Sequence, residues 1–263
     1  MSLGLPAQPR ANHVVNQVVD CGSSQAADRA WRELCQLARA PYRDAGRFAW
    51  HFAHGKLNRD PVFRSLLERG DLPAHTRVLD IGCGQGLLAS LLGAVDALAA
   101  DGRWPPSWAQ PPVGARYTGI ELMARDVARA AASVRGLQAA PKFICGDMCS
   151  TALVPCDVVV ILDVLHYVPL EAQQALLARV RGALLPHGRL LLRVGDQGNA
   201  RRFATSQWVD RLVTLARGHR VAPTYGRTVT GWVALLCELG FAVRTVPMSQ
   251  GTPFANVLLV ADR

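Results

Sequence analysis

The chain has 263 residues, half of them apolar, which suffices for one large α/β domain or for a domain with a modest cap. Its formal net charge is +9, a balance that fits nucleic acid, an anionic membrane surface or an acidic substrate as partner, but no run of five or six like charges occurs. No apolar stretch reaches the roughly 18 residues of a membrane span. Residues 1–15 lack a signal-peptide core, so we expect a cytoplasmic protein without stable membrane insertion.

The seven cysteines are irregularly spaced and include no C-x-x-C pair. Cys145 and Cys149 stand four apart without a second pair, so neither a disulfide framework nor a zinc site is expected, and no metal. Lysine occurs only at Lys56 and Lys142, a bias typical of GC-rich bacterial genes.

The chain divides into two predicted parts. In the first, residues 1–70, we expect residues 1–25 to be poorly structured and residues 26–70 to form a helical cap, because apolar residues there recur at helical spacing. The second part, 71–263, holds the main domain.

From Thr76 onward, short apolar strands alternate with helical stretches, which predicts a parallel sheet with helices on both faces. The predicted strands are 77–81, 115–122, 142–145, 157–163 and 188–194, and the helices begin near 87 and cover about 124–135, 170–183 and 231–240. Two final strands, 241–248 and 254–261, are close enough to form an antiparallel hairpin. The fold class is therefore α/β, a seven-stranded, mostly parallel, doubly wound sheet with an antiparallel C-terminal strand and an N-terminal helical cap.

Two segments interrupt this pattern. Residues 94–116 contain two Pro-Pro pairs and two tryptophans, which predicts a surface insertion. Residues 197–228 form a second irregular segment, expected on the substrate side, with one amphipathic helix over 203–216. Its arginines, together the densest basic set, belong either to a solvated surface or to an anion-binding face.

The stretch DIGCGQG, Asp80 to Gly86, lies between a strand and a helix. Its glycines, Gly82, Gly84 and Gly86, permit a tight turn and a close approach of a ligand to the backbone. The G-x-x-G spacing of a dinucleotide site is missing, and a carboxylate at Asp80 would repel a pyrophosphate. It suits a ligand with an ammonium group and no phosphate, such as S-adenosylmethionine (SAM).

DIGCGQG resembles the first motif of class I SAM-dependent methyltransferases, and the resemblance extends over residues 76–262. It implies that Glu121, which ends the second strand, binds the ribose hydroxyls, and that Asp147 after the third strand contacts the adenine amino group. It also assigns cofactor contacts to the motif and to these strand ends: Asp80, Gly82, Cys83, Gly84, Leu122, Met148 and Asp163. The alternative for the acidic residues is that they only cap turns and helices.

One departure from the family pattern concerns the second strand. The stretch from Gly86 to Glu121 is longer than the family usually shows, and the extra length is the Pro/Trp-rich segment. If Glu121 were misassigned, the remaining acidic candidates would be Asp96 and Asp101, but neither ends a strand-like run.

Methyl transfer mainly requires positioning of the acceptor, and a hydroxyl acceptor gains from a base. His166, in the loop after the fourth strand, is the candidate catalytic base, with a packing role as its alternative, and Tyr167 is a weaker candidate. Trp50, His51, His54 and Lys56 lie on the cap, which we expect to fold over the cofactor.

Missing sequence motifs exclude several classes of methyl acceptor. No NPPY-like tetrapeptide follows the fourth strand, and Pro155-Cys156 precedes that strand, where a cytosine-methylase nucleophile would not lie. No RNA-binding module is present, so nucleic acid is disfavoured and a small or lipid-like acceptor is expected. The cap loosely resembles that of bacterial methyltransferases of aryl-polyene-type pigment or other secondary lipid pathways.

Three alternatives remain open. The chain could be a nucleic-acid methyltransferase that uses its basic C-terminal face, a non-catalytic partner protein with the same fold, or an aminopropyl transferase. The intact acidic and glycine positions argue against the second, and the lack of an N-terminal β-domain argues against the third. The sequence does not indicate an oligomeric state.

Overall fold

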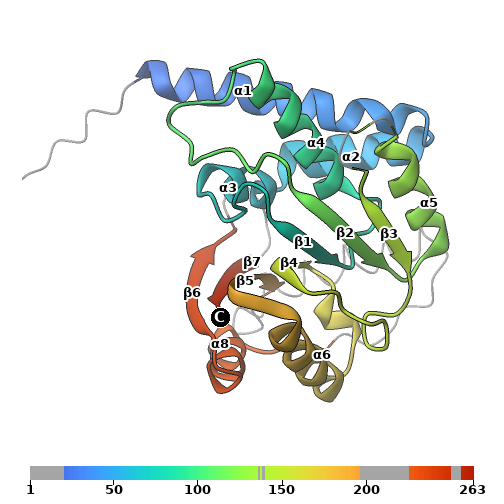
Figure 1. Cartoon of the computed structure of the whole chain (residues 1–263), viewed down its shortest axis with the longest axis vertical. Helices are drawn as coiled ribbons and strands as arrows, with labels where there is room; N and C mark the ends of the chain where they lie inside the picture. Colours follow the sequence, from blue (N-terminus) through green and yellow to red (C-terminus); the bar gives the residue numbers. More distant parts are fainter. Residues whose placement is uncertain (1–20, 136, 138–139, 196–224, 250–255) are drawn as a thin grey trace, which may run out of the picture.

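The computed structural model describes residues 21–135, 137, 140–195, 225–249 and 256–263. Its centre is a seven-stranded sheet in the order β3-β2-β1-β4-β5-β7-β6 (Figure 1). The strands are β1 (Arg77–Ile81), β2 (Arg116–Glu121), β3 (Lys142–Cys145), β4 (Cys156–Leu162), β5 (Leu184–Gly195), β6 (Ala242–Pro247) and β7 (Asn256–Asp262).

Strands β1 to β5 pair in parallel, whereas β7 runs antiparallel to both β5 and β6. The central strand β4 is almost wholly apolar and buried, as expected for a parallel strand covered on both faces. The predicted fold class and hairpin are confirmed, with strand ends within about two residues. The exception is β5, which begins at Leu184 because that residue pairs with Cys156 before an irregularity in the ladder.

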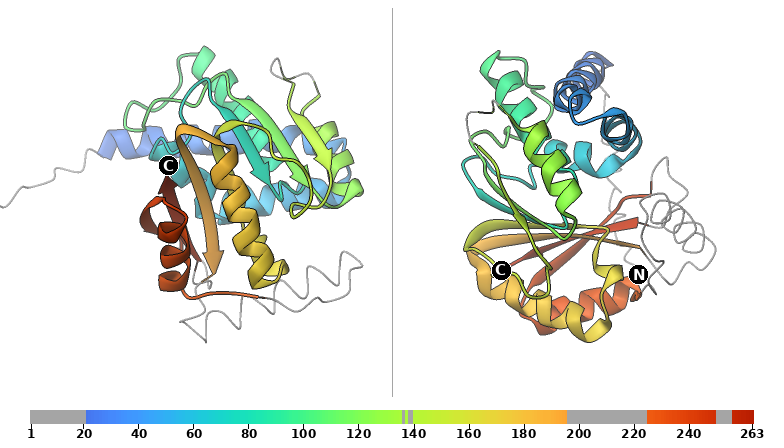
Figure 2. Two further views of the ribbon diagram at one scale, coloured as in Figure 1. Left: turned by 60° about the horizontal axis from the view of Figure 1, so that its bottom comes forward. Right: turned by 90° about the vertical axis from the view of Figure 1, so that its right-hand side faces the viewer.

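Helices cover both faces of the sheet (Figure 2). On one face lie α4 (Leu87–Ala100) and α5 (Ala124–Ser133), and on the other lie α6 (Leu170–Ala183) and α8 (Val229–Glu238). Each face has its own cluster of buried apolar side chains. This arrangement leaves the carboxyl ends of the parallel strands as the edge at which such sheets bind ligands.

The N-terminal cap consists of α1 (Cys21–Arg39), η1 (Ala40–Arg43), α2 (Arg47–Arg59) and α3 (Pro61–Glu68). It packs on α4, where the Ser90 hydroxyl donates to the Ala38 carbonyl at 2.7 Å, and its apolar residues share the core cluster of that face. Helix α1 begins at Cys21, so the expectation that the chain is poorly structured up to residue 25 is wrong for 21–25. Residues 1–20 lie outside the described residues.

The predicted surface insertion at 94–116 is also partly wrong. Helix α4 continues to Ala100 and buries Val95 and Leu98, because the alanine-rich stretch sustains a helix until Gly102 and the prolines beyond it. Trp108 is only 8% exposed and packs into the same core, with the Arg64 guanidinium over its ring. The excursion is therefore shorter than predicted and anchored by a buried side chain. The helix predicted over 203–216, with most of the segment 197–228, lies outside the described residues.

Candidate active site

The turn between β1 and α4 contains three glycines with left-handed backbone angles, φ 76° at Gly82, 55° at Gly84 and 73° at Gly86. A β-carbon at Gly82 would lie 2.6 Å from Val164 Cγ1, and one at Gly86 would lie 2.8 Å from the Ala130 β-carbon. A β-carbon at Gly84 would meet no atom within 4 Å. The outer glycines are therefore required by packing, whereas the middle one leaves open space where a ligand can approach the backbone.

Glu121, the last residue of β2, reaches the tip of this turn. Its Oε2 accepts from the Gly84 amide and its Oε1 from the Met123 amide, both at 2.9 Å. The two competing carboxylates lie elsewhere, since Asp96 accepts from the Gly114 amide and Asp101 pairs with Arg103. The structure thus brings Glu121, and neither competitor, to the glycine turn.

Asp80 lies beneath the turn and is only 5% exposed. Its Oδ2 accepts from the Tyr117 hydroxyl at 2.6 Å. Burial raises the pKa of Asp80 to about 7, and the nearby Glu121 charge adds to this, while the Tyr117 hydrogen bond works against it. The carboxyl therefore titrates near neutral pH, and at least one of its oxygens faces the sheet rather than a ligand.

Cys83 packs against β2. A β-carbon at Gly119 would lie 2.6 Å from its Sγ, so the thiol occupies the space that this glycine leaves free. Burial, with the charges of Asp80 and Glu121, raises the pKa of the thiol far above its ordinary value. Cys83 is a buried, protonated thiol beside the turn.

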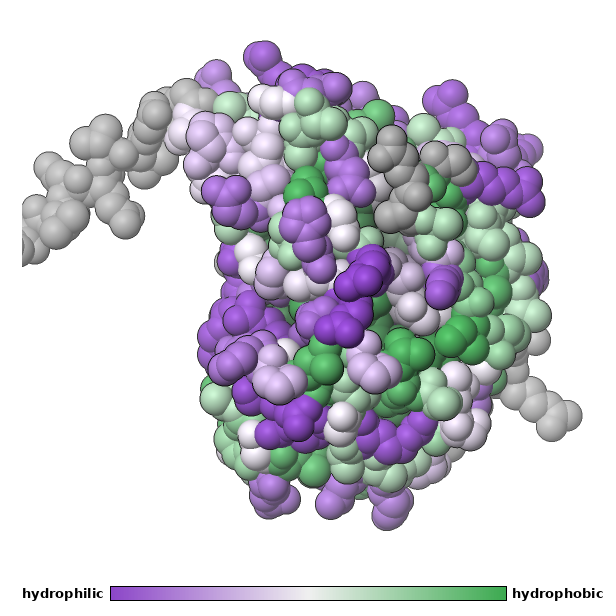
Figure 3. All heavy atoms as spheres, viewed as in Figure 1, coloured by the Kyte–Doolittle hydropathy of each residue, from purple (hydrophilic) through white to green (hydrophobic). Residues whose placement is uncertain are grey.

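The loops after β2 and β3 lie next to each other, joined by a bond from the Gly146 amide to the Glu121 carbonyl at 2.9 Å. Leu122, the first residue after β2, is 61% exposed. Figure 3 views the molecule from the opposite side, toward the amino ends of the parallel strands, where hydrophilic and hydrophobic residues are interspersed. Asp147 is exposed and accepts from the Cys149 amide at 2.8 Å, and the Met148 carbonyl accepts from Arg179. The predicted residues Leu122, Asp147 and Met148 therefore share one edge of the sheet with Glu121.

Asp163, directly after β4, has φ 59° and is ion-paired with Arg193 of β5 and with Lys56 of α2. Burial would raise the pKa of Asp163, but the charges of Arg193 and Lys56 lower it below its ordinary value. Sequence reasoning missed Arg193, although a single arginine inside the apolar run GRLLLRV could have indicated a buried charge.

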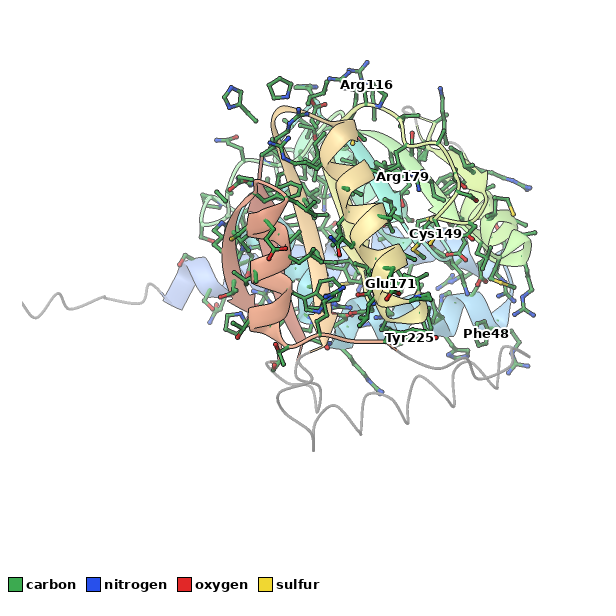
Figure 4. All side chains as sticks on the ribbon, turned by 90° about the horizontal axis from the view of Figure 1, so that it is seen from below. Phe48, Arg116, Cys149, Glu171, Arg179 and Tyr225 are labelled. Carbon is green, nitrogen blue, oxygen red and sulfur yellow. The ribbon has the colours of Figure 1, made fainter. Side chains whose placement is uncertain are left out.

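His166 lies in the short helix η2 (Leu165–Tyr167), with its ring centroid 4.0 Å from that of Tyr167. Gln173 of α6, fully buried and missed by the sequence analysis, fixes this loop by donating to the carbonyls of Leu165, Val168 and Tyr225. In Figure 4, Tyr225, Glu171 and Phe48 lie at one edge of the molecule, opposite Arg116 at the start of β2. That edge is the carboxyl end of the parallel strands.

The cap reaches the same edge, as Tyr42 and Lys56 show. The Tyr42 hydroxyl donates to the Gln85 carbonyl at 2.7 Å, and Lys56 lies beside Asp60 and Asp163. Trp50 instead stacks on His54 and, with Arg43, Arg47 and His51, lines a cavity of about 250 Å³ in the cap itself. Among the four cap residues singled out from the sequence, Lys56 lies next to another predicted site residue, Asp163.

In the described part of the chain, no group of three or more His, Cys, Asp or Glu residues is placed to hold a metal ion. Among the helices described, none is long and apolar enough to cross a membrane.

The chain is similar to known methyltransferases in sequence and in fold. A family model described as a methyltransferase domain matches residues 49–243. The magnesium protoporphyrin IX methyltransferase of Synechocystis PCC 6803 with bound S-adenosylhomocysteine superposes with a TM-score of 0.56 at 21% identity, over 85% of this chain and 93% of that one. Mitomycin 7-O-methyltransferase superposes with a TM-score of 0.58 at 21% identity, over 92% of this chain and 67% of that one.

A human structure has a similar fold. N-acetylserotonin methyltransferase in complex with SAM gives a TM-score of 0.55 at 20% identity, over 92% of this chain and 66% of that one. A search of curated proteins found no match. At these identities the solved structures establish the shared fold.

Proposed function

Because this chain belongs to the methyltransferase-domain family, as a SAM-dependent class I member, we propose that it methylates a hydroxyl group of a small or lipid-like acceptor. The observation that carries the cofactor part is the open backbone at Gly84 with the Glu121 carboxylate fixed beside it. The acceptor part is supported by the side chains exposed at the same edge.

The residues at the turn fit the cofactor. Each Glu121 oxygen accepts one backbone amide, which leaves lone pairs free for the two ribose hydroxyls. We further propose that the exposed Leu122 side chain and Met148 pack on the adenine and that Asp147, which is also exposed, accepts from its amino group. When bound, SAM supplies an electrophilic methyl group on a sulfonium.

Asp80 suits the cationic end of this cofactor. Its carboxyl titrates near neutral pH because it is buried, and a nearby ammonium or sulfonium favours the ionised form. The residue thus contributes charge beneath the turn without an oxygen fully exposed to water.

Several large apolar side chains are exposed near the same edge. Phe48, Tyr167 and Leu170 are exposed although they are large and hydrophobic, and they lie on segments at or near the carboxyl edge of the sheet. Exposed apolar side chains that gather beside a ligand site favour an acceptor with an apolar body. A hydroxyl-bearing aromatic or polyene molecule, as in aryl-polyene-type pigments, matches that description.

His166 is the proposed general base. Histidine ordinarily titrates near neutral pH, and a positioned base contributes about 10²–10⁴-fold to rate. We expect His166→Ala to reduce turnover by about that factor while the affinity for SAM stays within two-fold, because the cofactor contacts lie on other loops. Tyr167→Phe, which removes only the neighbouring hydroxyl, tests the weaker candidate base in the same assays.

Turnover, SAM affinity and melting temperature of His166→Ala together distinguish a catalytic base from a packing residue. A packing residue would instead lower the melting temperature and leave turnover nearly intact. Near-normal turnover in a stably folded variant contradicts the base assignment and favours a carboxylate acceptor, which is already ionised and needs no base.

The proposed function is tested by binding and by product analysis. Titration calorimetry should show micromolar-range binding of both SAM and S-adenosylhomocysteine. Mass spectrometry of reactions with phenols, aliphatic alcohols, carboxylates and polyene acids should then reveal an acceptor heavier by one CH₂, together with S-adenosylhomocysteine. Absence of binding of either ligand refutes the proposal, and transfer only to carboxylates refutes the hydroxyl preference.

A further inference from the structure

Four charged side chains form one network at the carboxyl edge of the sheet. Arg193 of β5, only 2% exposed, donates from Nε to Asp163 Oδ1 at 2.8 Å and from Nη2 to Asp60 Oδ2 at 2.7 Å. Its Nη2 and Nη1 make a second bond to Asp163 and to Asp60, respectively. Lys56 Nζ lies 2.9 Å from Asp60 and 3.6 Å from Asp163. The two positive and two negative charges balance.

The network joins the cap to the sheet. Asp60 lies between α2 and α3, where its Oδ1 also accepts from the Val62 amide at 3.2 Å and so caps α3. Lys56 comes from the last turn of α2, whereas Asp163 and Arg193 follow or belong to the adjacent strands β4 and β5. The fork of one buried guanidinium therefore fixes two segments that are far apart in the chain.

The network also continues to the glycine turn. Asp163 adopts a left-handed conformation, which is unfavourable for a residue with a β-carbon and persists only when its surroundings hold it. Its amide donates to the Arg193 carbonyl at 3.3 Å. The next residue, Val164, packs so closely on Gly82 that a β-carbon there would lie 2.6 Å from it. Arg193, Asp163, Val164 and Gly82 thus form a continuous series of contacts.

Stability alone does not account for such a network. Burial would raise the pKa of Asp60 and of Asp163, but Arg193 and Lys56 hold both below their ordinary values, so both stay ionised at neutral pH. Taking these charges out of water opposes much of their attraction, and well-packed apolar residues often serve as well. What apolar side chains lack is the directional, bidentate geometry that fixes two carboxylates at once.

We propose that Arg193 is a positioning residue that sets the glycine turn. Through Asp163 it holds the loop after β4 so that Val164 supports Gly82, and through Asp60 it ties the cap to the same loop. It acts on the cofactor turn without touching the cofactor. The consequence for ligand affinity rests on the proposed function, whereas the consequence for the turn itself does not.

The first test measures the turn in the ligand-free, full-length protein by amide hydrogen exchange. Arg193→Lys keeps the charge and loses the fork. We expect amides in 82–86 and 164–168 to exchange about 10-fold faster or more, including those of Gly84 and Val168, which are hydrogen-bonded in the folded chain. Arg189→Lys is the matched control: it lies on the same strand but pairs with Asp262, and it should leave these segments within two-fold.

Two outcomes overturn the proposal. One is unchanged exchange in 82–86 and 164–168. The other is an equal rise over the whole sheet and α6, because that is the signature of a merely structural role. A double-mutant cycle tests whether Arg193 acts on the turn through Val164. Val164→Ala should by itself accelerate exchange in the turn, and it should add little to the effect of Arg193→Lys. Fully additive effects of the two substitutions would show that Arg193 does not act through Val164.

If Arg193→Lys does not fold, Asp60→Asn provides a second test. Asp60→Asn keeps an oxygen for the Val62 amide and leaves the Arg193–Asp163 pair in place, so it releases only the cap side; we expect a smaller acceleration in the same two segments. S-adenosylhomocysteine affinity gives a separate readout, with about 10-fold weaker binding for Arg193→Lys and less than two-fold for Arg189→Lys. A wild-type chain without affinity would refute the proposed function, while the exchange data would still decide the role of Arg193.

Discussion

Among single residues, Glu121 connects the sequence motif to the ligand site most directly. Its carboxylate accepts backbone amides from the glycine turn and from the start of the following loop. The spacing from Gly86 to Glu121 had left Asp96 and Asp101 as competitors, and the hydrogen bonds place both away from the turn.

Replacement of Glu121 by alanine should therefore weaken SAM binding. Loss of hydrogen bonds to a charged group costs about 1.5–3 kcal/mol, or about 10- to 150-fold in the dissociation constant. Titration calorimetry measures this, with Asp96→Ala as a control that removes a carboxylate from α4. A silent Glu121→Ala, or an equal loss in Asp96→Ala, would show that the wrong acid was assigned.

Asp80 makes stability depend on pH in a defined direction. Its folded pKa is raised to about 7 by burial, above the value of about 3.9 expected in the unfolded chain. Below about pH 4 the carboxyl is neutral in both states and carries no penalty. Between pH 4 and 7 the unfolded state ionises first, so stability falls as pH rises, and above about 7 the loss is complete.

We therefore expect Asp80→Asn, without cofactor, to be more stable than the wild type at pH 8, by on the order of 1–3 kcal/mol. The difference should vanish near pH 4, as denaturant unfolding at several pH values can show. Asp157→Asn is a control for which the change in stability should have the opposite sign, because the hydrogen bond from Arg77 lowers the pKa of Asp157. A gain from Asp80→Asn that does not change with pH would contradict the burial argument.

At the scale of elements, helix α4 and the segment after it differ most from expectation. The helix extends to Ala100, and Trp108 closes over the core between the cap and α4. A flexible surface loop could be shortened at little cost, but this segment carries a buried indole. Replacing residues 98–114 with a short linker should therefore lower stability.

A single substitution tests this point. Trp108→Ala should cost about 3–5 kcal/mol in the free energy of unfolding, as for other buried aromatic side chains. Trp104→Ala should cost less, because that indole is only partly buried, although its Nε1 donates to the Ala109 carbonyl. If Trp108→Ala lowers the free energy of unfolding by less than about 1 kcal/mol, the segment is a surface insertion as the sequence predicted.

At the scale of the whole molecule, the cap and the sheet share one hydrophobic cluster. Leu34 of α1 is fully buried in it, together with Leu66 of α3 and Leu91 of α4. A shared core of this kind couples the unfolding of its parts, so we expect one cooperative transition rather than separate transitions for cap and sheet.

Leu34→Ala should consequently lower the melting temperature of the entire chain. A buried leucine costs about 2–5 kcal/mol when it is truncated, which corresponds to roughly 5–15 °C here. Leu37→Ala, in the same helix but 39% exposed, is the matched control and should shift the transition by little. Early melting of the cap alone, followed with far-UV and tryptophan signals, would show that the cap is a separate unit.

The sequence by itself determined the order of strands and helices, the glycine turn and the acidic residues at strand ends. These features follow from local rules: apolar periodicity, the backbone freedom of glycine, and the alternation that produces a parallel sheet. Glu121 could be chosen because the end of a strand is a local property, and the position of a strand end in a parallel sheet fixes its edge.

Only the tertiary structure decided which side chains meet across the chain. Asp163 pairs with Arg193, 30 residues later, and Arg193 also reaches Asp60, which lies 133 residues before it. Tyr42 reaches Gln85 over 43 residues, and Trp108 is buried in a segment whose prolines suggested exposure. Such contacts depend on how helices pack on a sheet and on the closure of long loops, and neither leaves a periodic signal in the sequence.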